Sequence, residues 1–166
     1  MTLGEIPRKS QPVDYLEPKP EDECGVFGLW APGEDVAKLT YFGLYALQHR
    51  GQEAAGIAAS DGEKIMVYKD LGLVSQVFDE TSLSALRGHI AVGHVRYSTT
   101  GSTTWENAQP MLGPVAEHTV ALAHNGNLTN TRELMEYVRE ASGQDISGEL
   151  GRGSTTDTAV MAALLS

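Results

Sequence analysis

The sequence has very little of three things: cysteine, clustered positive charge and long hydrophobic runs. One cysteine among 166 residues cannot form an internal disulfide, which excludes a disulfide-stapled secreted domain and fits the reducing cytoplasm. A formal net charge of −10 without a Lys/Arg cluster argues against nucleic acid or a membrane surface as partner. No apolar run approaches the roughly 20 residues of a membrane span. The N-terminus also lacks the basic and apolar regions of a secretory signal.

The composition otherwise fits one domain with a leader. Hydrophobic residues make up 41% of the chain, which is enough for a core. Residues 1–23 contain four prolines and end in the acidic run Glu21-Asp22-Glu23. Because proline fixes φ and donates no backbone hydrogen bond, we expect this leader to form neither helix nor strand. The folded domain is then expected over residues 24–166.

Hydrophobic periodicity predicts alternating groups of strands and helices. The expected strands are residues 25–30, 54–60, 64–69, 89–97 and 119–124. The expected helices are 36–49, 73–78, 82–86, a segment from 131 to about 143, and 159–165. The helix that begins near 131 is expected to bury Leu134, Tyr137 and Val138. Asp35 and Asn130 are expected helix caps, Asp61-Gly62 a hairpin turn, and residues 98–114 a long loop. This order indicates an α+β layered domain.

The only cysteine lies between the leader and the first predicted strand. Cleavage between Glu23 and Cys24 would place a thiol and an α-amine on one residue. An α-amine has a pKa of about 7.7–8.0, so it can act as a base for its own side chain near neutral pH. The alternative is a buried structural cysteine, and position alone favours that alternative because free cysteine is among the most buried residue types.

Further polar residues stand at the ends of predicted elements, and each has an ordinary structural alternative. Arg96 ends a strand and could bind a carboxylate through its planar guanidinium, or form a surface ion pair. Asn125 and Gly126 follow a strand and could supply the two donors of an oxyanion hole, or form a turn. Asp157 could hold an ammonium group or cap a helix.

Taken together, these groups describe one reaction. A thiol nucleophile, an oxyanion hole, a guanidinium for a carboxylate and a carboxylate for an amine suit hydrolysis of the side-chain amide of free glutamine. The five histidines lack the spacing and the carboxylate company of a zinc site.

Five motifs in order support this interpretation: Cys-Gly-Val-Phe-Gly at 24, Gln-His-Arg-Gly-Gln-Glu at 48, His-Val-Arg-Tyr-Ser-Thr at 94, His-Asn-Gly-Asn at 124 and Thr-Asp-Thr at 156. From Glu23 to its end the chain closely resembles the glutaminase domain of the glutamine phosphoribosylpyrophosphate amidotransferases, a class II amidotransferase family. Glucosamine-6-phosphate synthases share the plan. The synthases typically show Tyr-Arg-Gly-Tyr-Asp-Ser in place of the second motif and Thr-Arg-Trp-Ala-Thr in place of the third. In both places this chain resembles the phosphoribosylpyrophosphate enzymes instead.

The resemblance implies a four-layer αββα sandwich of the N-terminal-nucleophile hydrolase type. It also implies that the leader is removed autocatalytically, with Cys24 as nucleophile and its freed α-amine as base. Asn125 and Gly126 would then stabilise the oxyanion. The remaining implied residues contact glutamine: Arg96 its carboxylate, Asp157 its amine, and Arg50, Gly51, Tyr97 and Thr99 the walls of the pocket.

In the whole enzyme of this family, ammonia passes to a phosphoribosyltransferase domain and forms phosphoribosylamine, which begins purine synthesis. That domain is not in this chain. We therefore expect this chain to bind no cofactor. The sites for phosphoribosylpyrophosphate and magnesium, and the iron–sulfur cluster that some members carry, are expected in the missing C-terminal part. The full-length protein is expected to be a homo-oligomer.

The chain stops inside an apolar helix and lacks the closing strands of such a domain, so we expect a C-terminally truncated fragment. While the leader remains, Cys24 has a peptide nitrogen in place of a base, which predicts an inactive precursor. Two alternatives stay open: the glutaminase domain of a sugar-phosphate aminating enzyme, and a non-catalytic glutamine-binding or regulatory module.

Overall fold

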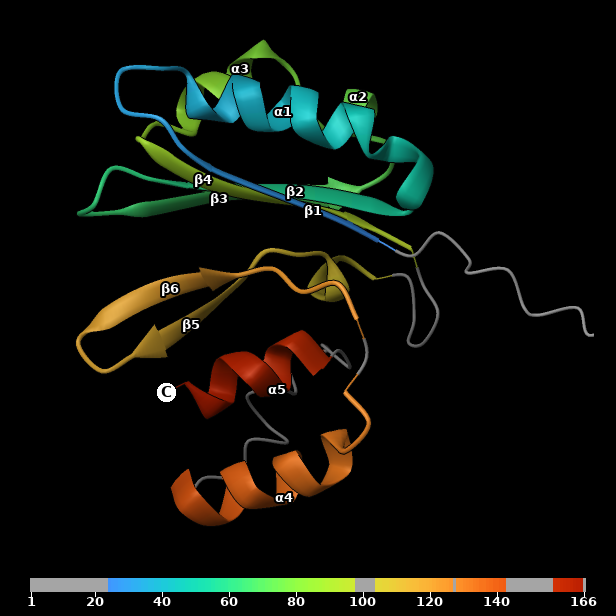
Figure 1. Ribbon diagram of the computed structural model, residues 1–166, viewed down its shortest axis with the longest axis vertical. Helices are drawn as coiled ribbons and strands as arrows, with labels where there is room; N and C mark the ends of the chain where they lie inside the picture. The colour runs from blue at the N-terminus through green and yellow to red at the C-terminus, as the bar shows by residue number, and fades with distance from the viewer. Residues whose placement is uncertain (1–23, 98–103, 127, 143–156, 166) are drawn as a thin grey trace, which may run out of the picture.

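The computed structural model describes residues 24–97, 104–126, 128–142 and 157–165 (Figure 1), so the predicted leader lies outside the described part. The elements in chain order are β1 (Gly25–Trp30), α1 (Val36–Ala46), the 3-10 turn η1 (Gln48–Arg50), β2 (Ala54–Ser60), β3 (Ile65–Leu71), α2 (Val74–Val77), α3 (Glu80–Ala85), β4 (Ile90–Arg96), the 3-10 turn η2 (Trp105–Asn107), β5 (Met111–Val115), β6 (His118–Leu122), α4 (Thr131–Ser142) and α5 (Asp157–Leu164).

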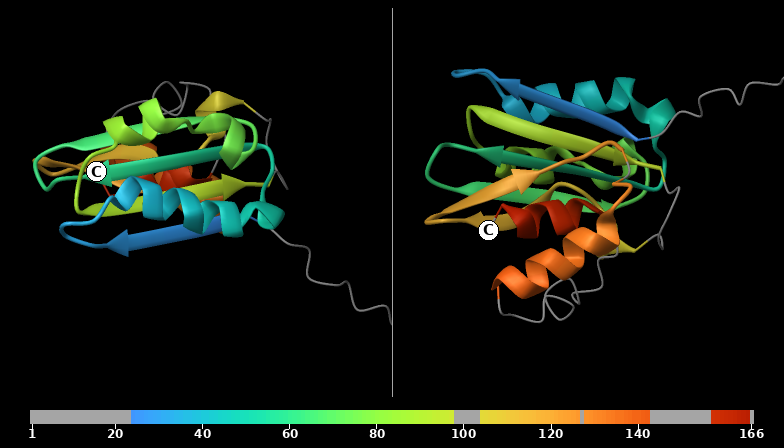
Figure 2. Two further views of the ribbon diagram at one scale, coloured as in Figure 1. Left: turned by 90° about the horizontal axis from the view of Figure 1, so that it is seen from above. Right: turned by 60° about the horizontal axis from the view of Figure 1, so that its bottom comes forward.

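The elements form four layers. One antiparallel sheet has the strand order β1-β4-β2-β3, and a second pairs β5 with β6. Helices α1, α2 and α3 cover the outer face of the larger sheet, and the smaller sheet faces its inner side (Figure 1). Helix α5 packs on β5, and α4 packs on α5; both lie beyond the smaller sheet in Figure 2. The predicted α+β fold with an αββα layer order is therefore confirmed.

Alternation along β4 divides its side chains between two interiors. Gly93 and Val95 face the helices: a Cβ added to Gly93 would lie 2.6 Å from the side chain of Thr40 in α1. His94 and Arg96 face the second sheet, since side chains alternate along a strand. The helix-facing core includes Leu44, Ile57 and Val95, each without exposed surface. Burying a side chain of this size contributes about 1.5–3 kcal/mol.

Strand β2 is buried on both faces and is built almost wholly from small residues. A Cβ added to Gly56 would lie 2.1 Å from the backbone oxygen of Gln109. Only glycine therefore lets the chain before β5 lie directly on the larger sheet. Two neighbours of Gln109, Ala108 and Pro110, are also fully buried.

The turn chemistry of the β2–β3 hairpin was predicted correctly. The Asp61 carboxylate accepts hydrogen bonds from the backbone N–H groups of Glu63 and Lys64, at 2.9 and 2.8 Å. Gly62 takes a φ of 95°, in the left-handed region that glycine enters without steric cost. The loop is longer than two residues, because β3 begins at Ile65.

Three predictions about elements were wrong in part. The helix predicted over 36–49 ends at Ala46 and continues as a 3-10 turn, although its cap at Asp35 is confirmed. The loop predicted over 98–114 contains η2 and most of β5 within its described residues. Tyr137, expected to be buried, is 63% exposed, whereas Val138 on the same helix is buried.

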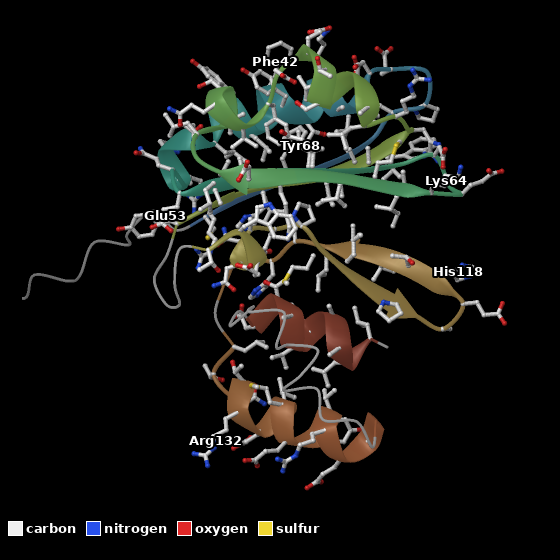
Figure 3. The ribbon with its side chains drawn as sticks, turned by 180° about the vertical axis from the view of Figure 1, so that it is seen from behind. Phe42, Glu53, Lys64, Tyr68, His118 and Arg132 are labelled. Carbon is white, nitrogen blue, oxygen red and sulfur yellow. The ribbon has the colours of Figure 1, made fainter. Side chains whose placement is uncertain are left out.

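The two ends of the larger sheet differ. Figure 3 places Glu53 and Lys64 at opposite ends. At the Lys64 end an apolar cavity of about 460 Å³ lies between the sheets, lined among others by Ala58, Ile65 and Ala121. At the Glu53 end β1 begins and β4 ends, and the polar residues gather there. Among the described residues, no helix has the length and apolar character needed to cross a membrane.

Candidate functional site

Cys24 stands immediately before β1 and beside the end of β4, because the antiparallel register pairs Gly25 with Val95. Its side chain is half-buried. The thiol donates to the Tyr97 carbonyl oxygen at 3.4 Å, and the Tyr97 N–H donates to the sulfur at 3.4 Å. The φ of Cys24 is 38°, a left-handed conformation that costs a non-glycine residue of order 1–3 kcal/mol.

Two further segments meet at the Cys24 backbone. The Arg50 Nε donates to the Cys24 carbonyl oxygen at 2.8 Å, and the Asn125 Nδ2 donates to the same oxygen at 3.3 Å. Arg50 belongs to η1, and Asn125 follows β6. Arg50 and Asn125, which lie 26 and 101 positions from Cys24, therefore share one acceptor on the residue predicted to be the nucleophile.

Arg96 ends β4 with its side chain in the space between the sheets and is only 3% exposed. Its Nη1 lies 3.5 Å from the Glu53 Oε2. Gly51 lies against the same strand: a Cβ there would be 2.7 Å from the carbonyl carbons of Val95 and Arg96. Gly51 thus contributes close backbone packing beside Arg96, which no larger residue would allow.

The segment carrying Asn125 and Gly126 is bonded on both sides. The His124 N–H donates to the Gln109 Oε1 at 2.7 Å, and the His94 Nε2 donates to the His124 carbonyl oxygen at 3.2 Å. On the far side, the Leu128 N–H donates to the Asp157 Oδ2 at 2.9 Å. The other oxygen of Asp157 lies 3.6 Å from the His124 Nδ1. Asn125 and Gly126, between these bonds, are exposed.

His94 is fully buried and uncharged near neutral pH. Burial lowers the pKa of its imidazole to about 4, opposed by the bond to the His124 carbonyl and reinforced by the nearby Arg96 and His124. The proton of the neutral ring lies on Nε2, because that nitrogen faces a carbonyl oxygen. The Nδ1 atom has no hydrogen-bond partner among the described residues.

The structure brings together the predicted residues Cys24, Arg50, Gly51, Arg96, Tyr97, Asn125, Gly126 and Asp157 at one end of the molecule. Thr99 lies outside the described residues. Tyr97 meets Cys24 through its backbone, while its ring is 43% exposed. In the described part of the chain, no group of three His, Cys, Asp or Glu is arranged to hold a metal ion.

Sequence reasoning assigned no role to His94, Gln109 or Glu53, which surround the site. A signal existed for His94, a polar residue inside a strand whose other residues before Arg96 are apolar or glycine. Gln109 offered only its place before Pro110 in a polar stretch. Its bond to a segment 15 residues away is a tertiary contact that no local pattern indicates.

Comparison with known proteins yields a consistent group. A family model described as glutamine amidotransferases class-II matches residues 33–145. The amidophosphoribosyltransferase of Mycobacterium tuberculosis is 62% identical over 156 residues, which is 93% of this chain and 29% of that protein. The amidophosphoribosyltransferase of Bacillus subtilis is 45% identical over 145 residues, 87% of this chain and 29% of that protein.

Solved structures agree with this result. Glutamine phosphoribosylpyrophosphate amidotransferase from Bacillus subtilis, complexed with ADP and GMP, superposes with a TM-score of 0.69 at 44% identity. The match covers 84% of this chain and 28% of that one. A structure described as the allosteric regulatory enzyme of purine biosynthesis superposes with a TM-score of 0.65 at 40% identity, covering 84% and 32% of the two chains. The chain thus spans less than a third of these relatives' length.

Proposed function

The chain belongs to the class II glutamine amidotransferases, and we propose that it hydrolyses glutamine as the glutaminase part of an amidophosphoribosyltransferase. One observation carries the proposal. The Cys24 thiol contacts the Tyr97 backbone, and the Cys24 carbonyl oxygen accepts hydrogen bonds from Arg50 and Asn125. Three distant segments therefore surround the only cysteine of the sequence.

We propose that the enzyme becomes active when the peptide bond between Glu23 and Cys24 is cut. In the uncut chain the Cys24 nitrogen is an amide and cannot accept a proton. Cutting converts it to an α-amine, which has a pKa of about 7.7–8.0 and can take the thiol proton. The left-handed φ of Cys24 supports this step, because a free N-terminus has no preceding peptide to constrain it.

In the proposed reaction the Cys24 thiolate attacks the amide carbon of glutamine. The carbonyl oxygen becomes an oxyanion, stabilised by the Asn125 side-chain amide and the Gly126 N–H. The protonated α-amine gives its proton to the leaving nitrogen, the C–N bond breaks, and ammonia departs from a thioester. Water then attacks the thioester, assisted by the same amine, and releases glutamate and the thiol. The Tyr97 N–H supports the thiolate by donating to the sulfur.

Arg96 and Asp157 are proposed to bind the two charged groups of glutamine. Arg96 already faces Glu53, and Asp157 accepts a hydrogen bond from the Leu128 N–H and lies 3.6 Å from the His124 Nδ1. A guanidinium has five donors and an ionised carboxylate about four acceptor positions, so both retain capacity for a substrate. The existing bonds fix their orientation before glutamine arrives.

We propose that the ammonia reacts with phosphoribosylpyrophosphate to form phosphoribosylamine, the first step of purine biosynthesis. The names of the relatives support this acceptor. The sites for phosphoribosylpyrophosphate and magnesium then belong to the remainder of the full-length protein, which is proposed to be a homo-oligomer.

Replacing Cys24 with Ser in the full-length protein tests the proposal. We expect glutamate release from glutamine to fall at least about a hundredfold, because a serine hydroxyl is a far weaker nucleophile than a thiolate. Synthesis of phosphoribosylamine from added ammonia is the internal control and should persist, since it does not need the thiol. Glutamine hydrolysis that survives the substitution contradicts the proposal. Use of a hexose phosphate as the ammonia acceptor would support the sugar-phosphate alternative instead.

A further inference from the structure

The peptide groups on both sides of His124 are bonded by two side chains from other elements. Gln109, 6% exposed, accepts from the His124 N–H at 2.7 Å. His94, with no exposed surface, donates to the His124 carbonyl oxygen at 3.2 Å. One of these two peptide groups precedes His124, and the other joins it to Asn125. Both are thus restrained immediately before the proposed oxyanion hole.

Both side chains come from rigid surroundings. His94 belongs to β4, which pairs with β1 on one side and β2 on the other. Gln109 stands where the chain lies directly on Gly56 of β2, between the fully buried Ala108 and Pro110. Neither residue can move without disturbing the larger sheet or its contacts with the second sheet.

Within the described residues, the backbone groups of the exposed Asn125 and Gly126 have no such hydrogen bonds. The Asn125 side chain donates to the Cys24 carbonyl oxygen at 3.3 Å, and the next described backbone bond along the chain is from the Leu128 N–H to Asp157. The Asn125 amide reaches from this backbone to the Cys24 carbonyl oxygen, so the orientation of the backbone decides where the amide lies. That orientation follows from the peptide joining it to His124, which His94 holds by its carbonyl oxygen.

We propose that His94 and Gln109 are positioning residues that orient the oxyanion hole through the backbone of His124. Their hydrogen bonds go to the His124 backbone, and their effect is on the orientation of Asn125 and Gly126. The inference rests on the proposed glutaminase function. A donor stabilises a transition state only if it is already aimed at the position of the oxyanion. Loosening the His124 backbone should therefore slow the chemical step more than it weakens glutamine binding.

Substitutions at His94 separate this role from packing. His94→Leu removes the donor at similar volume, whereas His94→Gln keeps a terminal N–H that can reach the His124 carbonyl. We expect kcat for glutamine hydrolysis in the processed full-length enzyme to fall roughly 10- to 100-fold in His94→Leu, with KM changed less than about threefold. His94→Gln should restore kcat to within about fivefold of the unmodified enzyme. The control is His118→Leu, the same exchange at an exposed histidine on the far hairpin.

A second variant covers the case in which His94→Leu does not fold. Gln109→Met removes the acceptor for the His124 N–H at nearly constant length and should give the same fall in kcat. The Gln109→Met variant also permits a measurement that does not depend on catalytic activity. Hydrogen exchange of the His124 amide, followed by NMR, should become at least about tenfold faster than in the unmodified protein.

The outcomes distinguish this inference from the proposed function. If the unmodified enzyme shows no Cys24-dependent glutaminase activity, the proposed function fails, and amide exchange at His124 still tests the restraint. If His94→Leu and His94→Gln lose kcat equally, or if KM rises while kcat is kept, the positioning role is overturned. Unchanged exchange at His124 in Gln109→Met overturns it as well.

Discussion

At the scale of single residues, the buried guanidinium of Arg96 is the feature most in need of explanation. It is 3% exposed and faces Glu53, whose carboxylate is 3.5 Å away. Its Nη1 has no hydrogen bond among the described residues. Buried arginine side chains normally have all their charge and donors matched. An arginine held in place with donor capacity to spare suits the recognition of a second carboxylate.

Replacing Arg96 with Lys should therefore raise KM for glutamine about tenfold or more while preserving the fold. Lysine keeps the charge but loses the planar pair of donors that binds a carboxylate at two points. The measurement is steady-state glutaminase kinetics, with Arg132→Lys as control because Arg132 is exposed on α4. An Arg96→Lys enzyme with reduced stability and unchanged KM would show that Arg96 serves only as the partner of Glu53.

Burial of His94 predicts a stability change in mild acid. Its pKa is lowered to about 4 in the folded protein, against about 6.5 in an unfolded chain. Between these values the unfolded state binds the extra proton, so stability is complete above pH 6.5 and is lost as the pH falls toward 4. The free energy of unfolding should drop by about 3 kcal/mol across this window from His94 alone.

Urea unfolding at pH 7.5 and pH 5 measures this effect. His94→Gln, which cannot titrate, should lose less stability between the two pH values than the unmodified protein. The opposite order, or an equal loss in both, would mean that His94 is not held neutral by its surroundings. His118→Gln, at an exposed position, should leave the pH dependence unchanged.

At the scale of elements, the sequence predicted best those segments whose local chemistry decides their structure. The hairpin at Asp61-Gly62 and the cap at Asp35 rest on bonds between neighbouring residues. The cap and the position of the hairpin were predicted correctly, although the hairpin loop is longer than the two residues expected. Strand β5 was missed because Gly113 and Pro114 are poor strand residues. It forms through its pairing with β6 and through Gly113, whose missing side chain lets α5 approach.

The contact between β2 and the segment before β5 gives a prediction at this scale. A methyl group at Gly56 would lie 2.1 Å from the backbone oxygen of Gln109, so Gly56→Ala must displace that segment or the strand. We expect a loss of stability of about 1–3 kcal/mol together with a fall in kcat, because Gln109 supports His124.

The matched control is Gly28→Ala in β1. The nearest atom to a Cβ at Gly28 is 3.8 Å away, an ordinary van der Waals distance. Thermal melting and glutaminase kinetics of the two variants make the comparison. Equal behaviour of Gly56→Ala and Gly28→Ala would contradict the direct contact between the two layers.

At the scale of the whole molecule, the order of the motifs along the chain predicted which residues gather, and topology explains how. Antiparallel pairing of β1 with β4 brings Cys24 beside Tyr97, and the return of the chain after β6 brings Asn125 to the same place. The supports at Gln109 and His94 could not be predicted in this way. They depend on how the two sheets face each other, which no single motif determines.

We propose that cleavage between Glu23 and Cys24 exposes a thiol within a formed glutamine pocket. Intact mass spectrometry of the full-length protein, before and after treatment with a glutamine-like diazoketone, tests it most directly. We expect loss of residues 1–23, followed by a single adduct on Cys24 that excess glutamine prevents and Cys24→Ser abolishes. An uncut protein that hydrolyses glutamine, or a cut protein that forms no adduct on Cys24, would contradict it.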